Sequence, residues 1–284
     1  MNKPLLLGSI DVESWICSDL FSAGRTPAEE VCTIEAPLRW ILETLKQYNV
    51  KMTFFCLGIY AEIKPDLIKL IIRDGHEIAS HGYSHIALTG TSKEQALYEM
   101  TESKKILENI TDYEVIGFRA ASAKSGSNLK LIENAGYRYD SSLVHALPIP
   151  GWYGDLSVPS IPFKLSEHKN FQSVDDRILE FPISSNPFIK LPMSAWWIRN
   201  MGRSYFLNSV KQSLKYYNYC AFYLHPWEFS NYFPIKKSAP FHVYRNIGGY
   251  MKNTFVKFLK RWSSEAVIAP YKNVYDRLKE QAGA

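Results

Sequence analysis

The chain alternates short apolar runs, typical of buried strands, with segments in which apolar residues recur at helical spacing. Residues 50–57 form one such run, and residues 34–48 and 59–72 on either side of it carry the helical spacing. Repeated strand–helix alternation with short connections predicts parallel strands covered by helices. About seven strands in one series predict an α/β fold built as a closed or nearly closed barrel, with an open doubly wound sheet as the alternative.

The other elements follow the same alternation. Further strands are expected at residues 5–10, 75–80, 114–118, 137–143, 177–183 and 219–224, and further helices at residues 91–110, 127–135 and 204–217. Thr91 and Glu94 have the spacing of a capping box. No Gly-rich phosphate loop follows the first strand, which argues against a nucleotide-binding sheet.

Polar residues gather where the expected strands end. Because βα folds carry their reactive groups at the carboxyl ends of strands, we expect these residues to meet on one rim. They are Asp11, Glu13, His81, His85, Arg119, Asp140 and His225.

Two histidines spaced four apart are the most specific feature of this rim. His81 and His85 would lie on one face of a helical turn, about 5–6 Å apart at Cβ, and could hold a divalent cation with one carboxylate. Two capping or surface histidines are the alternative. Asp11 and Glu13 point the same way along a strand, so one can bind the metal while the other acts as a base. The alternative for these acids is a helix N-terminus.

Arg119 and His225 complete the expected chemistry. Arg119 could pin one carboxylate and keep it ionised, although an ordinary structural ion pair has the same sequence signature. His225 could donate a proton near neutral pH, whereas a lone histidine at a strand end is otherwise structural.

Five sequence motifs, in this order, resemble those of the NodB-type polysaccharide deacetylases (carbohydrate esterase family 4). They are Asp11-Val12-Glu13, His81-Gly82-Tyr83-Ser84-His85, Gly117-Phe118-Arg119-Ala120, Tyr139-Asp140-Ser141-Ser142 and Leu224-His225-Pro226-Trp227-Glu228. The resemblance runs from about residue 5 to residue 230, and residues 75–81 are especially similar to the second motif. Residues 244–248 resemble the extra C-terminal region of deacetylases found beside exopolysaccharide export genes.

This resemblance implies a distorted (β/α) barrel and a zinc-type metal held by one carboxylate and two histidines. His81 and His85 are then ligands and Asp11 is the base. Glu13 becomes the third ligand, as in relatives whose two acids are one residue apart. Arg119 tethers Asp11, and His225 is the general acid. The third motif departs from the family because Ala121 stands where proline is usual.

Residue Gly82 marks a second departure, because the second motif usually has serine or threonine there. The missing hydroxyl could loosen the support of a metal ligand.

The predicted activity is that of a hydrolase, a metal-dependent N-deacetylase acting on an N-acetylated sugar or polysaccharide. The reaction's oxyanion would rest on the metal and on a backbone N–H after Arg119. Trp196, Trp227 and Asp140 are candidate substrate residues, and core packing is the alternative for the tryptophans. A deformylase or other amide hydrolase of the same superfamily is a second hypothesis. A non-catalytic glycan-binding protein is a third.

The charge of the chain is concentrated in its C-terminal part. The net charge of +5 is too small to predict a nucleic-acid partner. Residues 236–284 hold ten basic and three acidic residues, or +7, so residues 1–235 carry −2. We therefore expect a barrel at residues 1–235 and a basic extension at residues 236–284 that packs on it. Apolar residues at helical spacing in residues 250–262, with lysines around them, could instead lie on an anionic membrane.

Cysteine usage bears on the compartment. No two of the four cysteines have the spacing of metal ligands, which indicates reduced, intracellular thiols. The cysteines are Cys17, Cys32, Cys56 and Cys220. The start of the chain lacks the apolar stretch of a secretory signal. We expect a cytoplasmic protein, with the inner face of the membrane as the place where the basic extension would act. The sequence leaves the oligomeric state open.

Overall fold

The computed structural model describes residues 3–15, 26–233 and 239–283, so Cys17, Lys236 and Lys237 lie outside it. Within these ranges nine strands form one sheet in the order β6-β7-β5-β4-β3-β2-β1-β8, with β9 beside β1. The strands are β1 (Leu5–Val12), β2 (Thr53–Cys56), β3 (Glu77–Ser80), β4 (Gly117–Phe118), β5 (Tyr139–Asp140), β6 (Phe163–Lys164), β7 (Leu179–Glu180), β8 (Tyr219–Leu224) and β9 (Val267–Ile268).

The sheet curls into an incomplete barrel. Every pairing is parallel except that of β6 with β7, and the seven strands expected from the sequence, β1 to β5, β7 and β8, all belong to it. Ser184, which follows β7, donates its backbone N–H to the carbonyl of Ala221 in β8 at 3.0 Å. This bond joins segments far apart in the strand order. The predicted distorted α/β barrel is therefore confirmed, and the open doubly wound sheet is not formed.

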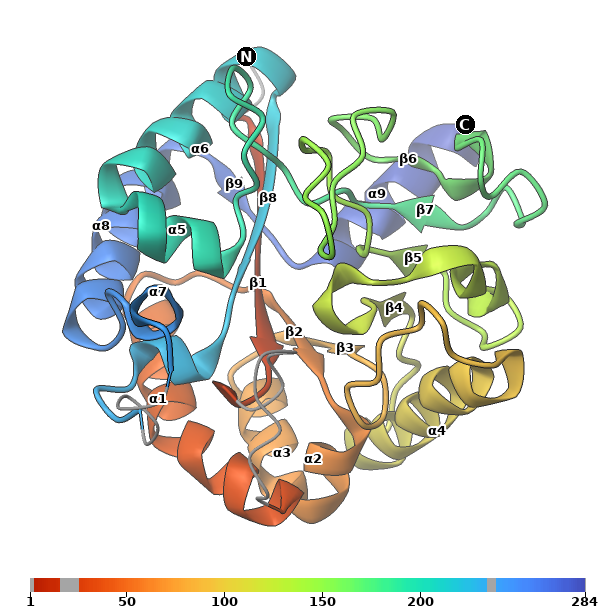
Figure 1. Cartoon of the computed structure of the whole chain (residues 1–284), viewed down its shortest axis with the longest axis horizontal. Helices are drawn as coiled ribbons and strands as arrows, with labels where there is room; N and C mark the ends of the chain where they lie inside the picture. The colour runs from red at the N-terminus through yellow and green to blue at the C-terminus, as the bar shows by residue number, and fades with distance from the viewer. Residues whose placement is uncertain (1–2, 16–25, 234–238, 284) are drawn as a thin grey trace.

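The helices cover the outside of the curled sheet. Figure 1 shows α1 to α4 below the sheet, α5, α6 and α8 at its left and α9 at its upper right. The α-helices are α1 (Pro27–Gln47), α2 (Gly58–Ile63), α3 (Pro65–Arg73), α4 (Lys93–Thr111), α5 (Ala195–Met201), α6 (Arg203–Tyr217), α7 (Phe241–Tyr244), α8 (Gly249–Glu265) and α9 (Tyr271–Gly283).

Three local expectations are corrected. The helix expected at residues 59–72 is two helices, because Pro65 begins α3. The cap of α4 is Ser92, whose Oγ accepts the Gln95 N–H at 3.2 Å, whereas Thr91 bonds back to the carbonyl of Ala87. The segment at residues 127–135 forms the 3-10 turn η3 (Gly126–Ile132) rather than an α-helix.

The C-terminal segment packs against the barrel through α8. The apolar stripe of this helix is buried, and it consists of Met251, Phe255, Phe258, Leu259 and Trp262. Phe258 contacts Phe206 of α6 and Phe222 of β8, with ring centroids 5.4 and 4.9 Å apart. Lys257 and Lys260 remain exposed. The apolar stripe of α8 thus faces the protein core.

We expect the two faces of α8 to differ sharply in their effect on stability. Phe258→Ala should lower the free energy of unfolding by about 3–5 kcal/mol, because it removes a fully buried ring between two others. Lys257→Ala, one residue away on the exposed face, should change it by less than about 0.5 kcal/mol. Urea unfolding measures both, and a small effect of Phe258→Ala would show that α8 does not belong to the core.

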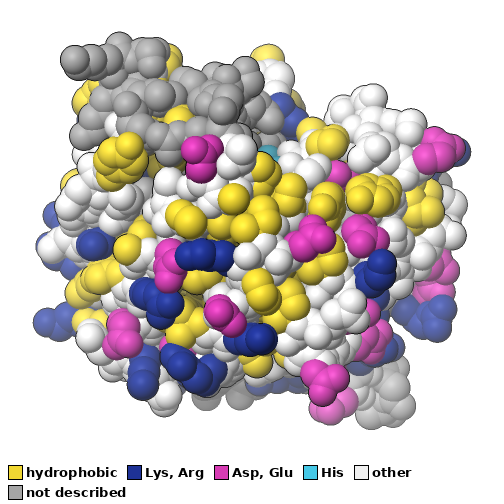
Figure 2. Space-filling view, turned by 90° about the horizontal axis from the view of Figure 1, so that it is seen from below, with side chains coloured by type: hydrophobic (Ala, Val, Ile, Leu, Met, Phe, Trp, Pro, Cys, Tyr) yellow, Lys and Arg dark blue, Asp and Glu magenta, His cyan; other side chains and the backbone are white. Residues whose placement is uncertain are grey.

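The face formed by the first helices carries charges of both signs. Figure 2 shows acidic and basic side chains interspersed with apolar ones on the side seen from below. Exposed pairs such as Lys69 with Asp66 and Lys105 with Glu102 lie three residues apart on their helices. In the described part of the chain, none of the helices has the length and apolar character needed to span a membrane.

Candidate active site

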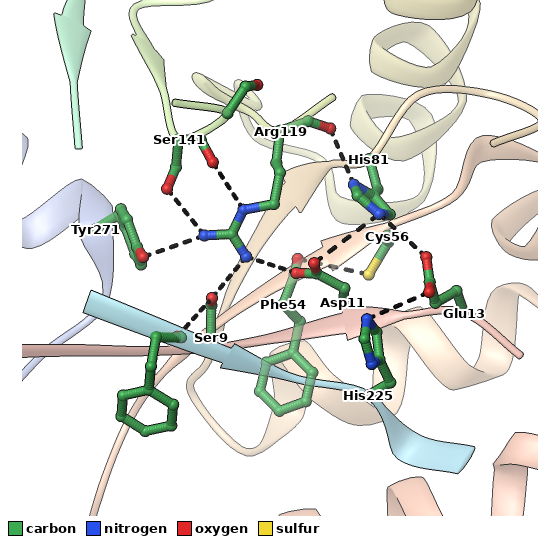
Figure 3. Close-up of polar contacts among 12 residues, drawn as sticks. Ser9, Asp11, Glu13, Phe54, Cys56, His81, Arg119, Ser141, His225 and Tyr271 are labelled. Atoms are coloured by element: carbon green, nitrogen blue, oxygen red, sulfur yellow. Dashed lines mark hydrogen bonds and ion pairs between the residues drawn. The ribbon is translucent and has the colours of Figure 1, made fainter. Parts of the chain in front are cut away.

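The carboxyl ends of β1 and β3 bring the predicted acids and histidines together. Asp11 lies in β1 and Glu13 directly follows it, while His81 directly follows β3. Both strands are parallel neighbours of β2, so their ends open on the same rim. All three side chains are almost completely buried, and Figure 3 shows them converging with His225.

The loop that carries the two histidines is not the helical turn expected from their spacing. His85 adopts a left-handed backbone conformation, with φ of 66°, so the loop doubles back toward β1. Glu99 of α4 organises the loop, because its carboxylate accepts the N–H groups of Tyr83 and Ser84 at 3.0 and 2.7 Å and the Ser84 hydroxyl at 2.6 Å. No sequence pattern pointed to Glu99, which lies in the middle of a helix and is buried.

Three ligand-type atoms meet at the centre of the site. The Glu13 carboxylate oxygen Oε2 lies 2.7 Å from His85 Nε2 and 3.2 Å from His81 Nε2. The His81 Nδ1 atom lies 2.9 Å from the carbonyl oxygen of Arg119, which directs Nε2 toward Glu13. Burial alone would raise the pKa of Glu13, but the charges of His85 and His225 and hydrogen bonds from His81 and His85 hold it well below its usual value.

This cluster fits a divalent metal ion. The ligand atoms of Glu13, His81 and His85 all lie within 4.8 Å of one another. One carboxylate and two imidazoles, with further positions left for other ligands, form a set typical of catalytic zinc and related divalent ions. A backbone carbonyl on the far nitrogen of a ligating histidine is the usual support for such a ligand, and His81 has it.

Asp11 is held beside the cluster by a buried arginine. Arg119 Nη1 donates to Asp11 Oδ1 at 2.6 Å and to the Ser9 hydroxyl at 2.7 Å. Its Nη2 donates to the hydroxyls of Ser141 and Tyr271 at 2.9 and 3.2 Å. The second oxygen of Asp11, Oδ2, lies 3.9 Å from His81 Nε2. Asp11 thus faces the cluster with one oxygen and the guanidinium with the other, as Figure 3 shows.

His225 approaches the cluster from the end of β8. Its Nε2 lies 3.3 Å from Glu13 Oε1, and its Nδ1 lies 3.4 Å from Glu228 Oε2. Burial alone would lower the pKa of His225, but the charge of Glu13 and the hydrogen bond and charge of Glu228 raise it to about 9.

A cavity of about 120 Å³ opens over these groups. Its floor includes Asp11, Glu13, His81 and Arg119, and its walls include Trp152, Tyr153, Trp196, Tyr223 and Trp227. Trp196 is partly exposed there. Trp227 is only 8% exposed, and its ring stacks on His225 with centroids 5.9 Å apart. Both predicted tryptophans line the cavity, but Trp227 also packs against a site residue.

The structure places Asp140 away from this cavity, so its assignment as a substrate residue is wrong. Asp140 is fully buried, and its carboxylate accepts the hydroxyl and N–H of Ser142 at 2.7 and 2.9 Å. Burial raises the pKa of Asp140. Burial and the charge of Asp140 together raise the pKa of Glu180. Asp140 therefore supports the barrel interior and cannot touch a sugar.

The backbone N–H expected to bind an oxyanion is also already engaged. Ala120, directly after Arg119, donates its N–H to the Ser142 hydroxyl at 2.8 Å. An oxyanion at the cluster would need a different donor. The sequence could not reveal this because Ser142 reaches Ala120 only through the pairing of β4 with β5.

Two family models match consecutive parts of the chain. The model of the polysaccharide deacetylases matches residues 36–139, and a domain of unknown function (DUF3473) matches residues 141–265. A peptidoglycan-N-acetylglucosamine deacetylase from Bacillus cereus is 40% identical over 73 residues, which are 26% of this chain and 26% of that protein. The matched part thus spans about a quarter of that relative.

Solved structures resemble the whole chain in fold. A Mycobacterium smegmatis protein assigned to the polysaccharide deacetylases has a TM-score of 0.68 at 19% identity, covering 99% of this chain and 92% of that one. An allantoinase has a TM-score of 0.62 at 16% identity, covering 96% and 88%. At these identities the likeness concerns the fold.

Proposed function

We propose that this chain, whose residues 36–139 match the model of the polysaccharide deacetylases, is a metal-dependent hydrolase that removes the acetyl group of an N-acetylated sugar or polysaccharide. One observation carries the proposal: an arginine-bound aspartate stands beside a cluster of one carboxylate and two histidines, at the floor of an aromatic-walled cavity. Glu13, His81 and His85 would hold the metal, for which zinc suits the ligand set.

A divalent ion at this cluster would polarise the amide carbonyl and lower the pKa of a bound water. Asp11 would accept the proton of that water on the oxygen facing the cluster. Arg119 keeps Asp11 in place and favours its ionised form, in which it can act as a base. His225 Nε2 faces the same centre from β8 and would protonate the departing amine. The aromatic walls would exclude water and offer apolar faces to a sugar ring.

We expect His225→Asn to lower kcat by about 10² or more with little change in KM, because it removes the proton donor but not the cavity. The donor must be protonated, so activity of the wild-type enzyme should fall as the pH rises through the pKa of His225. That pKa is about 9 with the charges of Glu13 and Glu228 beside the ring, and a cation on Glu13 would move it lower. A kcat–pH profile should lose its alkaline limb in the variant. An unchanged limb would remove His225 from the reaction.

A mass-spectrometric screen of the metal-loaded protein tests the proposed reaction. N-acetylated amino sugars and oligosaccharides should lose about 42 daltons, the mass of an acetyl group less one hydrogen. N-formylated sugars and cyclic amides in the same screen test the alternative of another amide hydrolase of the superfamily. Binding of glycans without any mass change would support the third alternative, a non-catalytic glycan-binding protein.

A further inference from the structure

A buried ion pair lies beside the proposed acid and lines the same cavity, and no step described above uses it. The side chains of Arg199 in α5 and Glu228 in the turn η5 (Pro226–Phe229) are 2% and 0% exposed, and Arg199 Nε donates to Glu228 Oε1. Arg199 Nη1 also donates to the backbone carbonyls of Val243 and Arg245 at 2.7 and 3.0 Å. A planar, always charged guanidinium suits such a fixed, multiply bonded position.

Glu228 contacts His225 directly, and Arg199 reaches its ring through Trp227 and Glu228. Glu228 Oε2 accepts the backbone N–H of His225 at 3.0 Å and lies 3.4 Å from its Nδ1. The indole of Trp227 stacks on the imidazole at an interplanar angle of 15°, and the Arg199 guanidinium lies 4.9 Å from the indole centroid. The His225 ring is thus held at Nδ1 by Glu228 and on one face by Trp227. Arg199 contacts both Glu228 and Trp227.

The segment at residues 243–248 locks this arrangement from the C-terminal side. The backbone carbonyls of Val243 and Arg245 bind the Arg199 side chain. In addition, the side-chain amide of Asn246 donates to the backbone carbonyl of Arg199 at 2.7 Å. Gly248 donates its N–H to the carbonyl of Glu228 at 2.7 Å. Arg199, Glu228 and this segment all lie within residues 141–265, the part matched by the domain of unknown function.

We infer that Arg199 is a positioning residue for the proposed deacetylation: through Glu228 and Trp227 it orients His225 so that Nε2 faces the reaction centre, and residues 243–248 hold it in place. This inference rests on the proposed function. It assigns to the second matched segment the role of completing the active site.

The test replaces both charges at once, so that neither is left buried without its partner. Arg199→Met with Glu228→Leu leaves no buried charge unpaired. It does remove the partners of the Val243 and Arg245 carbonyls and of the His225 N–H, so its melting temperature should fall, and kcat is compared at a temperature at which both proteins are fully folded. We expect kcat to fall about 10–100-fold while the bound metal stays unchanged. Arg203→Met is the matched control, because Arg203 links α6 to Asn253 of α8 without touching the site, and its kcat should stay at the wild-type value.

A purely structural ion pair would leave kcat per folded molecule at the wild-type value in the double variant, and that result overturns the inference. Nitrogen-15 NMR of the histidine rings provides a readout that does not need turnover. The ring signals of His225 should shift in the double variant and stay in place in Arg203→Met. If the wild-type protein deacetylates nothing in the screen, the proposed function fails, whereas unshifted His225 signals overturn the positioning role separately.

Discussion

Replacing His85 by alanine is expected to remove both the bound metal and all measurable deacetylation. The Glu13 oxygen that lies 2.7 Å from His85 Nε2 would keep only His81 as a partner ligand. Two remaining ligands hold a divalent ion poorly against water and chelators. His81→Ala should behave in the same way. Elemental analysis of the purified variants gives the metal content, and acetate release gives the activity.

His76→Asn is the control for this experiment. His76 is also buried, but it precedes β3 and its Nδ1 accepts the Met52 N–H at 3.2 Å, which the side-chain oxygen of asparagine can replace. The His76→Asn protein should keep one equivalent of metal and full turnover. A His85→Ala protein that retains metal and activity would show that the metal, if any, is held elsewhere.

Asp11→Asn is expected to lower kcat by about 10²–10⁴ and to leave the metal bound, because the amide keeps the shape of the side chain but cannot accept a proton. Asp11 makes its 2.6 Å bond to Arg119 and stands 3.9 Å from His81 Nε2, farther from the ligand atoms than Glu13 is. Kinetics and metal content, measured on the same samples, check both parts.

Glu13→Gln is the matched variant, and it should weaken metal binding, because Glu13 contacts both histidines. Loss of metal in Asp11→Asn together with an intact metal site in Glu13→Gln would exchange the two roles.

The convergence of the main site residues could be predicted because it depends on local rules. Asp11 and His81 end strands of a parallel sheet, and such ends share a rim. The i, i+4 spacing of His81 and His85 gave the right pair for the wrong reason. They meet through a left-handed bend at His85 braced by Glu99, and no periodic pattern encodes that bend.

The errors and omissions have a common physical cause. Asp140 ends a strand of only two residues, too short for the alternation of side chains to tell which face it presents, and it turned inward to Ser142. Arg199 and Tyr271 reach the site from segments distant in the chain: Tyr271 bonds Arg119 across 152 positions. Such contacts depend on the packing of α5 and α9 onto the barrel, which the sequence pattern does not specify.

The most direct test of this account is the effect of metal on one wild-type sample incubated with N-acetylated oligosaccharides. Chelation should abolish the 42-dalton loss, and one equivalent of zinc or a related divalent ion per chain should restore it. Full deacetylation by the metal-free protein, or none by the protein with one equivalent of metal bound, would contradict the assignment of Glu13, His81 and His85 as a catalytic metal site.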